Sequence, residues 1–260
     1  MELNRASSRA GSSAGGDDGG RRSISGLQQQ SMPGISTEVW DPARAAAAQN
    51  APGCTILYRG IDQARISGLF ADDGTLSNID TLLSPPPTDF SGRLPMFYFT
   101  PDVRVAEYYA AYAKRRTNCE SVVILELRIP NAVIETLSEP RIKRLYWPSS
   151  EWKELVWSCR NRRKLPSHLT ATKDAILIIG SRKPNHVYGG LSTWQDITED
   201  FLLRIQDDGR PGGNGRIAIQ YVISGQEEGV DWLIENGGRD IKALPYPQSA
   251  LQRLVGEGRS

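Results

Sequence analysis

Short apolar segments, rich in β-branched and aromatic residues, recur along the chain without a regular alternation with helices. Such segments predict strands, and they span residues 54–60, 96–100, 121–129, 155–158, 175–180 and 217–224. Regular alternation of strands and helices would favour a doubly wound parallel sheet. The irregular order, without an internal repeat, instead predicts an α+β fold.

Helical patterns are fewer, and the clearest one begins near Thr100. Thr100 is a suitable N-cap, Pro101 fits the first helical position, and Asp102 brings an acid into the first turn. We expect this helix to run to about Arg116, where basic residues suit a helix C-terminus. Further helices are predicted behind Asp41-Pro42 in an Ala-rich segment, over 193–205 and over 226–236.

By composition, the 260-residue chain divides into a tail, one main domain and a C-terminal end. The first 36 residues hold 8 Ser and 7 Gly, and no aromatic residue precedes Trp40. Such a segment cannot bury enough apolar surface to offset the entropy of ordering it, so we expect residues 1–36 to be a disordered tail. The remaining boundaries are a main domain at 37–240, with a core at 53–181 and an extension at 182–240, and a C-terminal tail at 241–260.

The charges of the chain are nearly balanced, with 31 Lys and Arg against 30 Asp and Glu and a formal net charge of +1. No bulk charge therefore draws it to nucleic acid or to a membrane surface. Basic clusters at 114–116, 141–144 and 160–164 would allow a phosphate or RNA contact, but we favour solvated surface for them. Because there is no apolar run of about 18 residues and no apolar signal core, we expect no membrane span and a cytoplasmic or nuclear location.

The residues that commonly bind metals or form disulfides are few and scattered. Cys54, Cys119 and Cys159 are far apart in the sequence, which argues against a disulfide framework and against a zinc knuckle. His168 and His186 show neither metal-ligand spacing nor a short-range partner. The sequence therefore predicts no metal cofactor.

Three short motifs, in a fixed order, carry the residue types that could do chemistry. Leu57-Tyr58-Arg59-Gly60 has an arginine at the end of the first predicted strand. Tyr98-Phe99 ends a strand that leads into the helix carrying Tyr109. The segment 151–157 has Glu154 at the head of another predicted strand.

This ordered set resembles the ADP-ribosyltransferase superfamily, which includes bacterial mono-ADP-ribosylating toxins and the poly(ADP-ribose) polymerases. Members of the family carry a triad on three separate strands: Arg or His first, Ser or Tyr second, and Glu third. Arg59 matches the first position, Tyr98 the second and Glu154 the third. The resemblance covers residues 53–181 and implies an α+β fold with a split sheet and flanking helices.

The resemblance also implies cleavage of the bond between nicotinamide and ribose in NAD+, the substrate, with ADP-ribose passed to a macromolecular acceptor such as a protein, or to water. Glu154 would stabilise the positive charge that develops on the ribose. Arg59 would hold phosphate or ribose oxygens, and Tyr98 and Tyr109 would stack on nicotinamide. No step requires a metal. The residues expected to contact NAD+ are Arg59, Gly60, Tyr98, Phe99 and Tyr109.

The chain departs from the family pattern near its proposed acid. Trp152 stands two residues before Glu154, where arginine-modifying toxins have Glu or Gln, and the Arg-Tyr-Glu combination belongs to neither common branch. Glu228, in Gln226-Glu227-Glu228, is a second candidate for the third position, although it also fits the acidic first turn of a helix. The alternative function is therefore a catalytically inactive module of the same fold that binds a nucleotide or a protein.

Overall fold

The computed structural model describes residues 32–49, 52–182, 191–206 and 215–257, with the side chains of 253–257 excepted. Residues 1–31 of the predicted disordered tail lie outside the described residues. The helices are α1 (Pro42–Ala48), α2 (Val103–Thr117), α3 (Asn131–Glu135), α4 (Ser150–Arg160), α5 (Glu227–Asn236) and α6 (Gln248–Glu257). The strands are β1 (Cys54–Asp62), β2 (Met96–Phe99), β3 (Val122–Pro130), β4 (Ile142–Leu145), β5 (Leu177–Ser181), β6 (Arg204–Ile205), β7 (Arg216–Ile217), β8 (Ile219–Ser224) and β9 (Lys242–Pro245).

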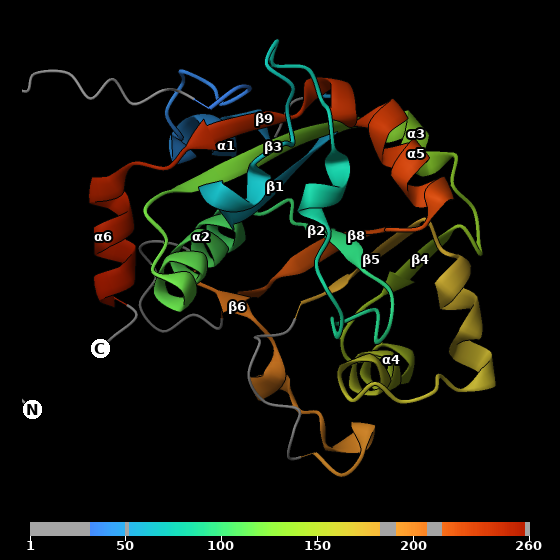
Figure 1. Cartoon of the computed structure of the whole chain (residues 1–260). Coiled ribbons are helices and arrows are strands. Elements are labelled where there is room, and N and C mark those ends of the chain that lie inside the picture. The colour runs from blue at the N-terminus through green and yellow to red at the C-terminus, as the bar shows by residue number, and fades with distance from the viewer. Residues whose placement is uncertain (1–31, 50–51, 183–190, 207–214, 258–260) are drawn as a thin grey trace, which may run out of the picture. The chain divides into compact units, whose positions relative to one another are not determined.

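These strands form two larger sheets and a short ribbon (Figure 1). The first sheet has the order β1-β3-β9 and is antiparallel throughout. The second has the order β2-β8-β5-β4, in which β4 and β5 are parallel and the other pairs antiparallel. The ribbon pairs β6 with β7. Sheets of this kind with helices on their faces make an α+β fold, which confirms the predicted class.

The two sheets meet where β1 passes β2. Tyr58 and Thr100 exchange both backbone hydrogen bonds of an antiparallel bridge, with N–O distances of 2.7 and 2.9 Å. Beyond this bridge Arg59 stays paired with β3, whereas Phe99 pairs with Tyr221 of β8. The sheet is therefore split, and β1 and β2 separate at the residues that follow Tyr58 and precede Thr100.

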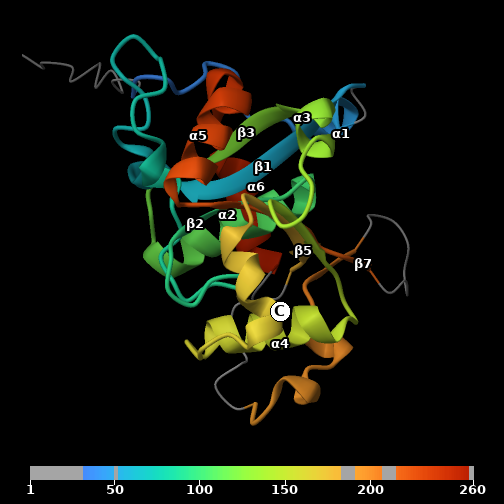
Figure 2. The same cartoon turned by 90° about the vertical axis from the view of Figure 1, so that its right-hand side faces the viewer.

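Helix α2 covers one face of the first sheet. Since side chains alternate between the two faces of a strand, only every second residue of β1 points toward α2. Ile56 and Tyr58 of β1 pack against α2, together with Ala106 and Ala110 of that helix. Leu57 points to the opposite face and joins the largest apolar cluster, which also contains residues of the second sheet. Figure 2 shows α2 below β1 and α4 below β5, so each larger sheet has its own covering helix.

Helix α4 replaces the strand that we predicted over 155–158, and that prediction is wrong. Ser149 accepts a hydrogen bond from the Trp152 backbone N–H at 3.2 Å and caps the helix. Trp152, Leu155, Val156 and Cys159 recur at helical spacing and pack against Tyr98, Ile178 and Val222 on the second sheet. Four adjacent residues, three of them apolar, are too few to distinguish a buried strand from one turn of a buried helix.

One further secondary-structure prediction is wrong, and the two predicted C-terminal ranges contribute strands to the sheets. The segment 193–205 forms two short 3-10 turns and strand β6 rather than a helix. The C-terminal tail predicted over 241–260 instead contains β9, which pairs with β3, and helix α6. The extension predicted over 182–240 contains β8, which lies between β2 and β5 within the second sheet. The sheets therefore need the C-terminal third of the chain.

Candidate functional site

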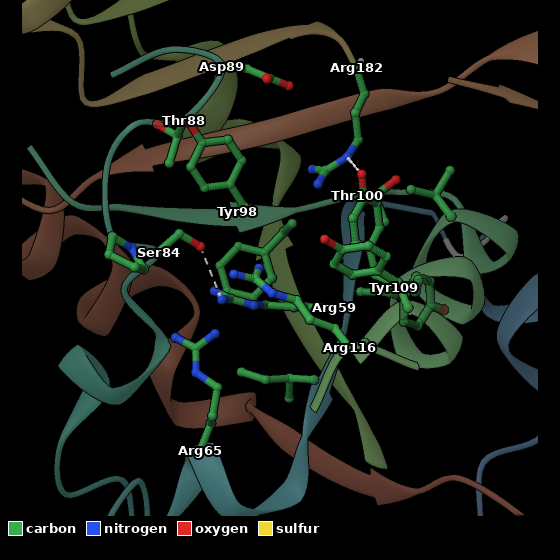
Figure 3. Close-up of a pocket in the computed structure, with 18 of the residues that line it drawn as sticks. Arg59, Arg65, Ser84, Thr88, Asp89, Tyr98, Thr100, Tyr109, Arg116 and Arg182 are labelled. Atoms are coloured by element: carbon green, nitrogen blue, oxygen red, sulfur yellow. Dashed lines mark hydrogen bonds between the residues drawn. The ribbon is translucent and has the colours of Figure 1, made fainter. Parts of the chain in front are cut away.

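A cavity of about 680 Å³ opens at the split between β1 and β2 (Figure 3). Its volume is within the range of small-molecule sites. β1 contributes Arg59 and Gly60, β2 contributes Tyr98 and Phe99, and α2 contributes Tyr109. All five residues predicted to contact a dinucleotide therefore line one cavity.

Arg59 is a buried cation without a carboxylate partner among the described residues. The residue is only 9% exposed. It donates to the carbonyl oxygen of Leu82 and to the hydroxyl of Ser84, the latter at 3.2 Å. Burial, followed by the charges of Arg65 and Arg182, lowers the pKa of Arg59 to about 9. The guanidinium is still protonated at neutral pH, so an anion entering the cavity would offset an uncompensated positive charge.

Gly60 serves the packing of α2 against β1. A Cβ atom at this position would come within 2.2 Å of the Ala106 carbonyl oxygen and 2.5 Å of the Ala110 backbone nitrogen. The strand and the helix can approach this closely only because residue 60 has no side chain. The approach also brings the face of α2 that carries Tyr109 to the cavity wall.

Tyr98 points from β2 toward the far side of the cavity. Its hydroxyl accepts a hydrogen bond from the Phe90 backbone N–H at 3.3 Å. Burial and the nearby charge of Asp89 raise the pKa of Tyr98 well above its ordinary range, so the phenol stays neutral. A neutral aromatic ring fixed at its hydroxyl end is a stable wall for a flat ligand group.

Tyr109 is already in contact with a cation. The Arg182 guanidinium lies 3.8 Å from the centre of the Tyr109 ring, and its Nε donates to the Tyr109 hydroxyl at 2.6 Å. Burial raises the pKa of Tyr109, although Arg182 acts in the opposite direction. One face of this ring is therefore occupied by Arg182, and any stacking with a ligand would have to use the rest of the ring.

Asp89 is the carboxylate among the cavity-lining residues, and it was not predicted from the sequence. Its Oδ1 accepts from the Arg160 Nε at 2.7 Å, and its Oδ2 accepts from the Gln220 amide at 3.1 Å. The Gln220 carbonyl oxygen accepts in turn from Arg182 at 3.0 Å. We call Asp89, Arg160, Gln220 and Arg182 the aspartate network. Burial alone would raise the pKa of Asp89, but Arg160, Arg182 and the hydrogen bonds hold it below its usual range.

Glu154 does not line the cavity. It lies on α4, where its carboxylate is 2.9 Å from the His168 Nε2 and 20% exposed. Glu228, the second candidate, lies in the first turn of α5, is 63% exposed, and forms an ion pair with Arg141 at 2.6 Å. Arg59 and Tyr98 therefore line one cavity, and both predicted acids lie outside it.

Gln220 lies where β8 runs beside β2. Tyr221 pairs with Phe99, so Gln220 follows next toward Thr100, and its side chain is fully buried on the same face as Val222 and Tyr98. A sequence signal for it exists, because Gln220 is a polar residue between apolar and aromatic residues of the strand. For Arg116 and Arg160 the signal was the basic clusters at 114–116 and 160–164. We interpreted these as solvated surface, but one arginine of each lines the cavity.

The described residues also bear on two other kinds of site, a metal centre and a membrane span. No group of three or more His, Cys, Asp or Glu side chains is arranged to hold a metal ion in the described ranges. None of the helices in those ranges is both long enough and apolar enough to cross a membrane. His186, one of the two histidines of the chain, lies outside the described residues.

Comparison of the chain with protein-family models, with curated proteins and with solved structures found no match.

Proposed function

We propose that the chain binds NAD+, or a closely related dinucleotide, in the cavity at the split, as a binding module of the ADP-ribosyltransferase kind. The observation that carries the proposal is the convergence of Arg59 and Tyr98 on one positively charged cavity that neither Glu154 nor Glu228 lines. Arginine matches the oxygens of a pyrophosphate, and tyrosine offers a flat surface to a base or to nicotinamide.

The order of the strands supports the proposed fold. The first-position arginine lies on β1, the second-position tyrosine lies on β2 and leads into α2, and β8 lies beside β2 in the second sheet. In this proposal the third position belongs to Gln220 at the head of β8 rather than to Glu154. Gln220 is neutral and its amide is hydrogen-bonded to Asp89 and Ser181, so it offers no charge to an oxocarbenium-like ribose.

A catalytic function is the second candidate, and Asp89 is the observation that favours it. Its carboxylate is ionised, belongs to the cavity wall and contacts Gln220. However, the carboxylate is only 2% exposed and is already neutralised by Arg160. An acid held in this way supplies little net negative charge to a ligand, so binding without turnover is the function that we favour.

Calorimetry with NAD+ and an assay of nicotinamide release, both on the full chain, separate these functions. The binding module predicts NAD+ binding that is lost in Arg59→Gln, with no nicotinamide released. Nicotinamide release that disappears in a folded Asp89→Asn variant would instead establish the transferase or glycohydrolase. Glu154→Gln is the matched acid-to-amide control and is expected to leave binding unchanged. Failure of the wild-type chain to bind NAD+ or a related dinucleotide would overturn the proposal.

A further inference from the structure

The charges that line the cavity exceed what NAD+ can neutralise. Five arginines line it, Arg59, Arg65, Arg116, Arg160 and Arg182, together with one acid, Asp89. These six groups leave a net charge of +4 on the lining at neutral pH. A pyrophosphate diester carries about two negative charges and a phosphomonoester adds about 1.5 to 2 more at pH 7. A ligand with both groups therefore matches the cavity better than a ligand with the pyrophosphate alone.

The excess charge is concentrated on one side of Tyr98. Figure 3 shows Asp89 and Arg182 on one side of this ring and Arg59, Arg65 and Arg116 on the other. On the first side the aspartate network joins each of its four polar side chains to another member. On the other side, none of the three arginines forms an ion pair with a carboxylate within the ranges described. We call Arg59, Arg65 and Arg116 the arginine end.

Three different elements build the arginine end. Arg59 comes from β1, Arg65 from the turn that follows β1, and Arg116 from the last turn of α2. Tyr109, Tyr112 and Arg116 follow one another at helical spacing and all line the cavity. The segments that follow β1 and α2 meet, since the Gln63 N–H donates to the Ser121 carbonyl at 3.1 Å. Arg65 and Arg116 therefore lie in the same region of the molecule, and both line the cavity.

Burial differs among the three arginines in a way that suits a dianion. Arg59 forms a buried floor, whereas Arg65 and Arg116 are exposed at the mouth. A phosphate held between them would keep part of its hydration while it contacts several guanidinium groups, and this lowers the cost of removing a doubly charged group from water. The Ser84 hydroxyl, which already accepts from Arg59, also lines the cavity there.

We propose that the arginine end binds a phosphomonoester, so that the preferred ligand is a dinucleotide with a ribose 2′-phosphate, NADP+, rather than NAD+. Arginine is the residue that accommodates a 2′-phosphate in other dinucleotide sites. This inference rests on the proposed function, because it specifies the ligand of the same cavity.

The test is calorimetry of the full chain with NAD+ and with NADP+ at one fixed ionic strength. We expect NADP+ to bind at least about tenfold more tightly than NAD+, since a charge-assisted contact contributes more than the about 1.4 kcal/mol that a tenfold change requires. The double variant Arg65→Gln/Arg116→Gln should reduce this preference to about twofold or less, mainly by weakening NADP+. Arg115→Gln, on the same turn of α2 but not lining the cavity, is the matched control and should keep the preference.

The outcomes separate this inference from the proposed function. Binding of NAD+ as tight as that of NADP+, or a preference that survives in the double variant, would overturn the inference and leave the proposed function intact. Failure of both nucleotides to bind the wild-type chain would overturn the two together. Thermal unfolding of each variant, compared with the wild type, establishes that any loss of binding occurs in a folded protein.

Discussion

The two sides of the cavity differ in how their charged side chains are compensated. In the aspartate network, the carboxylate of Asp89 has partners at both oxygens, and Gln220 uses both ends of its amide. At the arginine end, Arg59 donates only to a carbonyl and a hydroxyl and stays electrostatically uncompensated. We infer that the first arrangement stabilises the fold, whereas the second lowers stability and offers a site to an anion. The following predictions test this contrast, from the largest expected effect to the smallest.

Asp89→Asn should cause the largest loss of stability, about 3 kcal/mol in the free energy of unfolding. The change leaves the partly buried Arg160 without its counter-charge and turns an amide N–H₂ toward donors that need an acceptor. Urea unfolding followed by circular dichroism measures this loss. A loss below about 1 kcal/mol would mean that the network is not the structural element that we infer.

The same pair of proteins should differ less at acid pH. Because the pKa of Asp89 is lower in the folded protein than the unfolded value of about 3.9, its stabilising contribution is complete above about pH 5. The contribution is lost as the pH falls through the lower folded value. We therefore expect the wild type and Asp89→Asn to differ more in unfolding midpoint at pH 6 than at pH 3. A difference that is constant over this range would contradict an ionised Asp89.

Arg59→Met should have the opposite signature, a loss of ligand binding together with a gain in stability of about 1 kcal/mol. The variant removes a buried charge that no carboxylate compensates and keeps an unbranched side chain of similar length. Calorimetry with the dinucleotide and urea unfolding measure the two effects. If the variant is markedly less stable than the wild type, Arg59 is a structural residue rather than a binding residue.

Glu154→Gln should have the smallest effect, a change of less than about 1 kcal/mol in the free energy of unfolding. Its partner His168 is 55% exposed, and ion pairs at the surface contribute little. Comparison with Asp89→Asn is direct, since both replace an acid by its amide. A loss of stability as large as that of Asp89→Asn would show that burial does not distinguish the two acids.

Much of the fold could be predicted from the sequence, because its strands carry strong local patterns. The apolar and β-branched content around β1, β3, β5 and β8 indicates strands without reference to other parts of the chain. The predicted start of α2 differs from the structure by two residues. Asp102, rather than Thr100, is the N-cap, and its side chain accepts from the Arg104 backbone N–H at 2.9 Å. The prediction failed at α4, where three consecutive apolar residues at 155–157 also fit a strand. In the structure they belong to a helix whose buried residues include Trp152 and Val156.

Some residues of the candidate site could likewise be predicted from the sequence, and others could not. Arg59 and Tyr98 could be identified because each lies in a short strand motif that resembles a known family. The acid could not be identified, because Asp89 lies in an irregular segment rich in proline, which has no strand or helix periodicity to show which side chains are buried. Arg116 and Arg115 are adjacent and chemically identical, and the packing of α2 in the folded chain determines that Arg116 lines the cavity.

The sequence alone therefore determined the α+β class, most of the strands, and the arginine and tyrosine that share the cavity. These properties depend on local periodicity and on residues near strand ends. The tertiary structure decided that β8 and β9 complete the two sheets, that Asp89 rather than Glu154 lines the cavity, and that the positive charge gathers on one side of Tyr98. The physical reason is that burial and charge compensation depend on contacts between residues far apart in the sequence, such as Gln220 and Asp89, which are 131 positions apart.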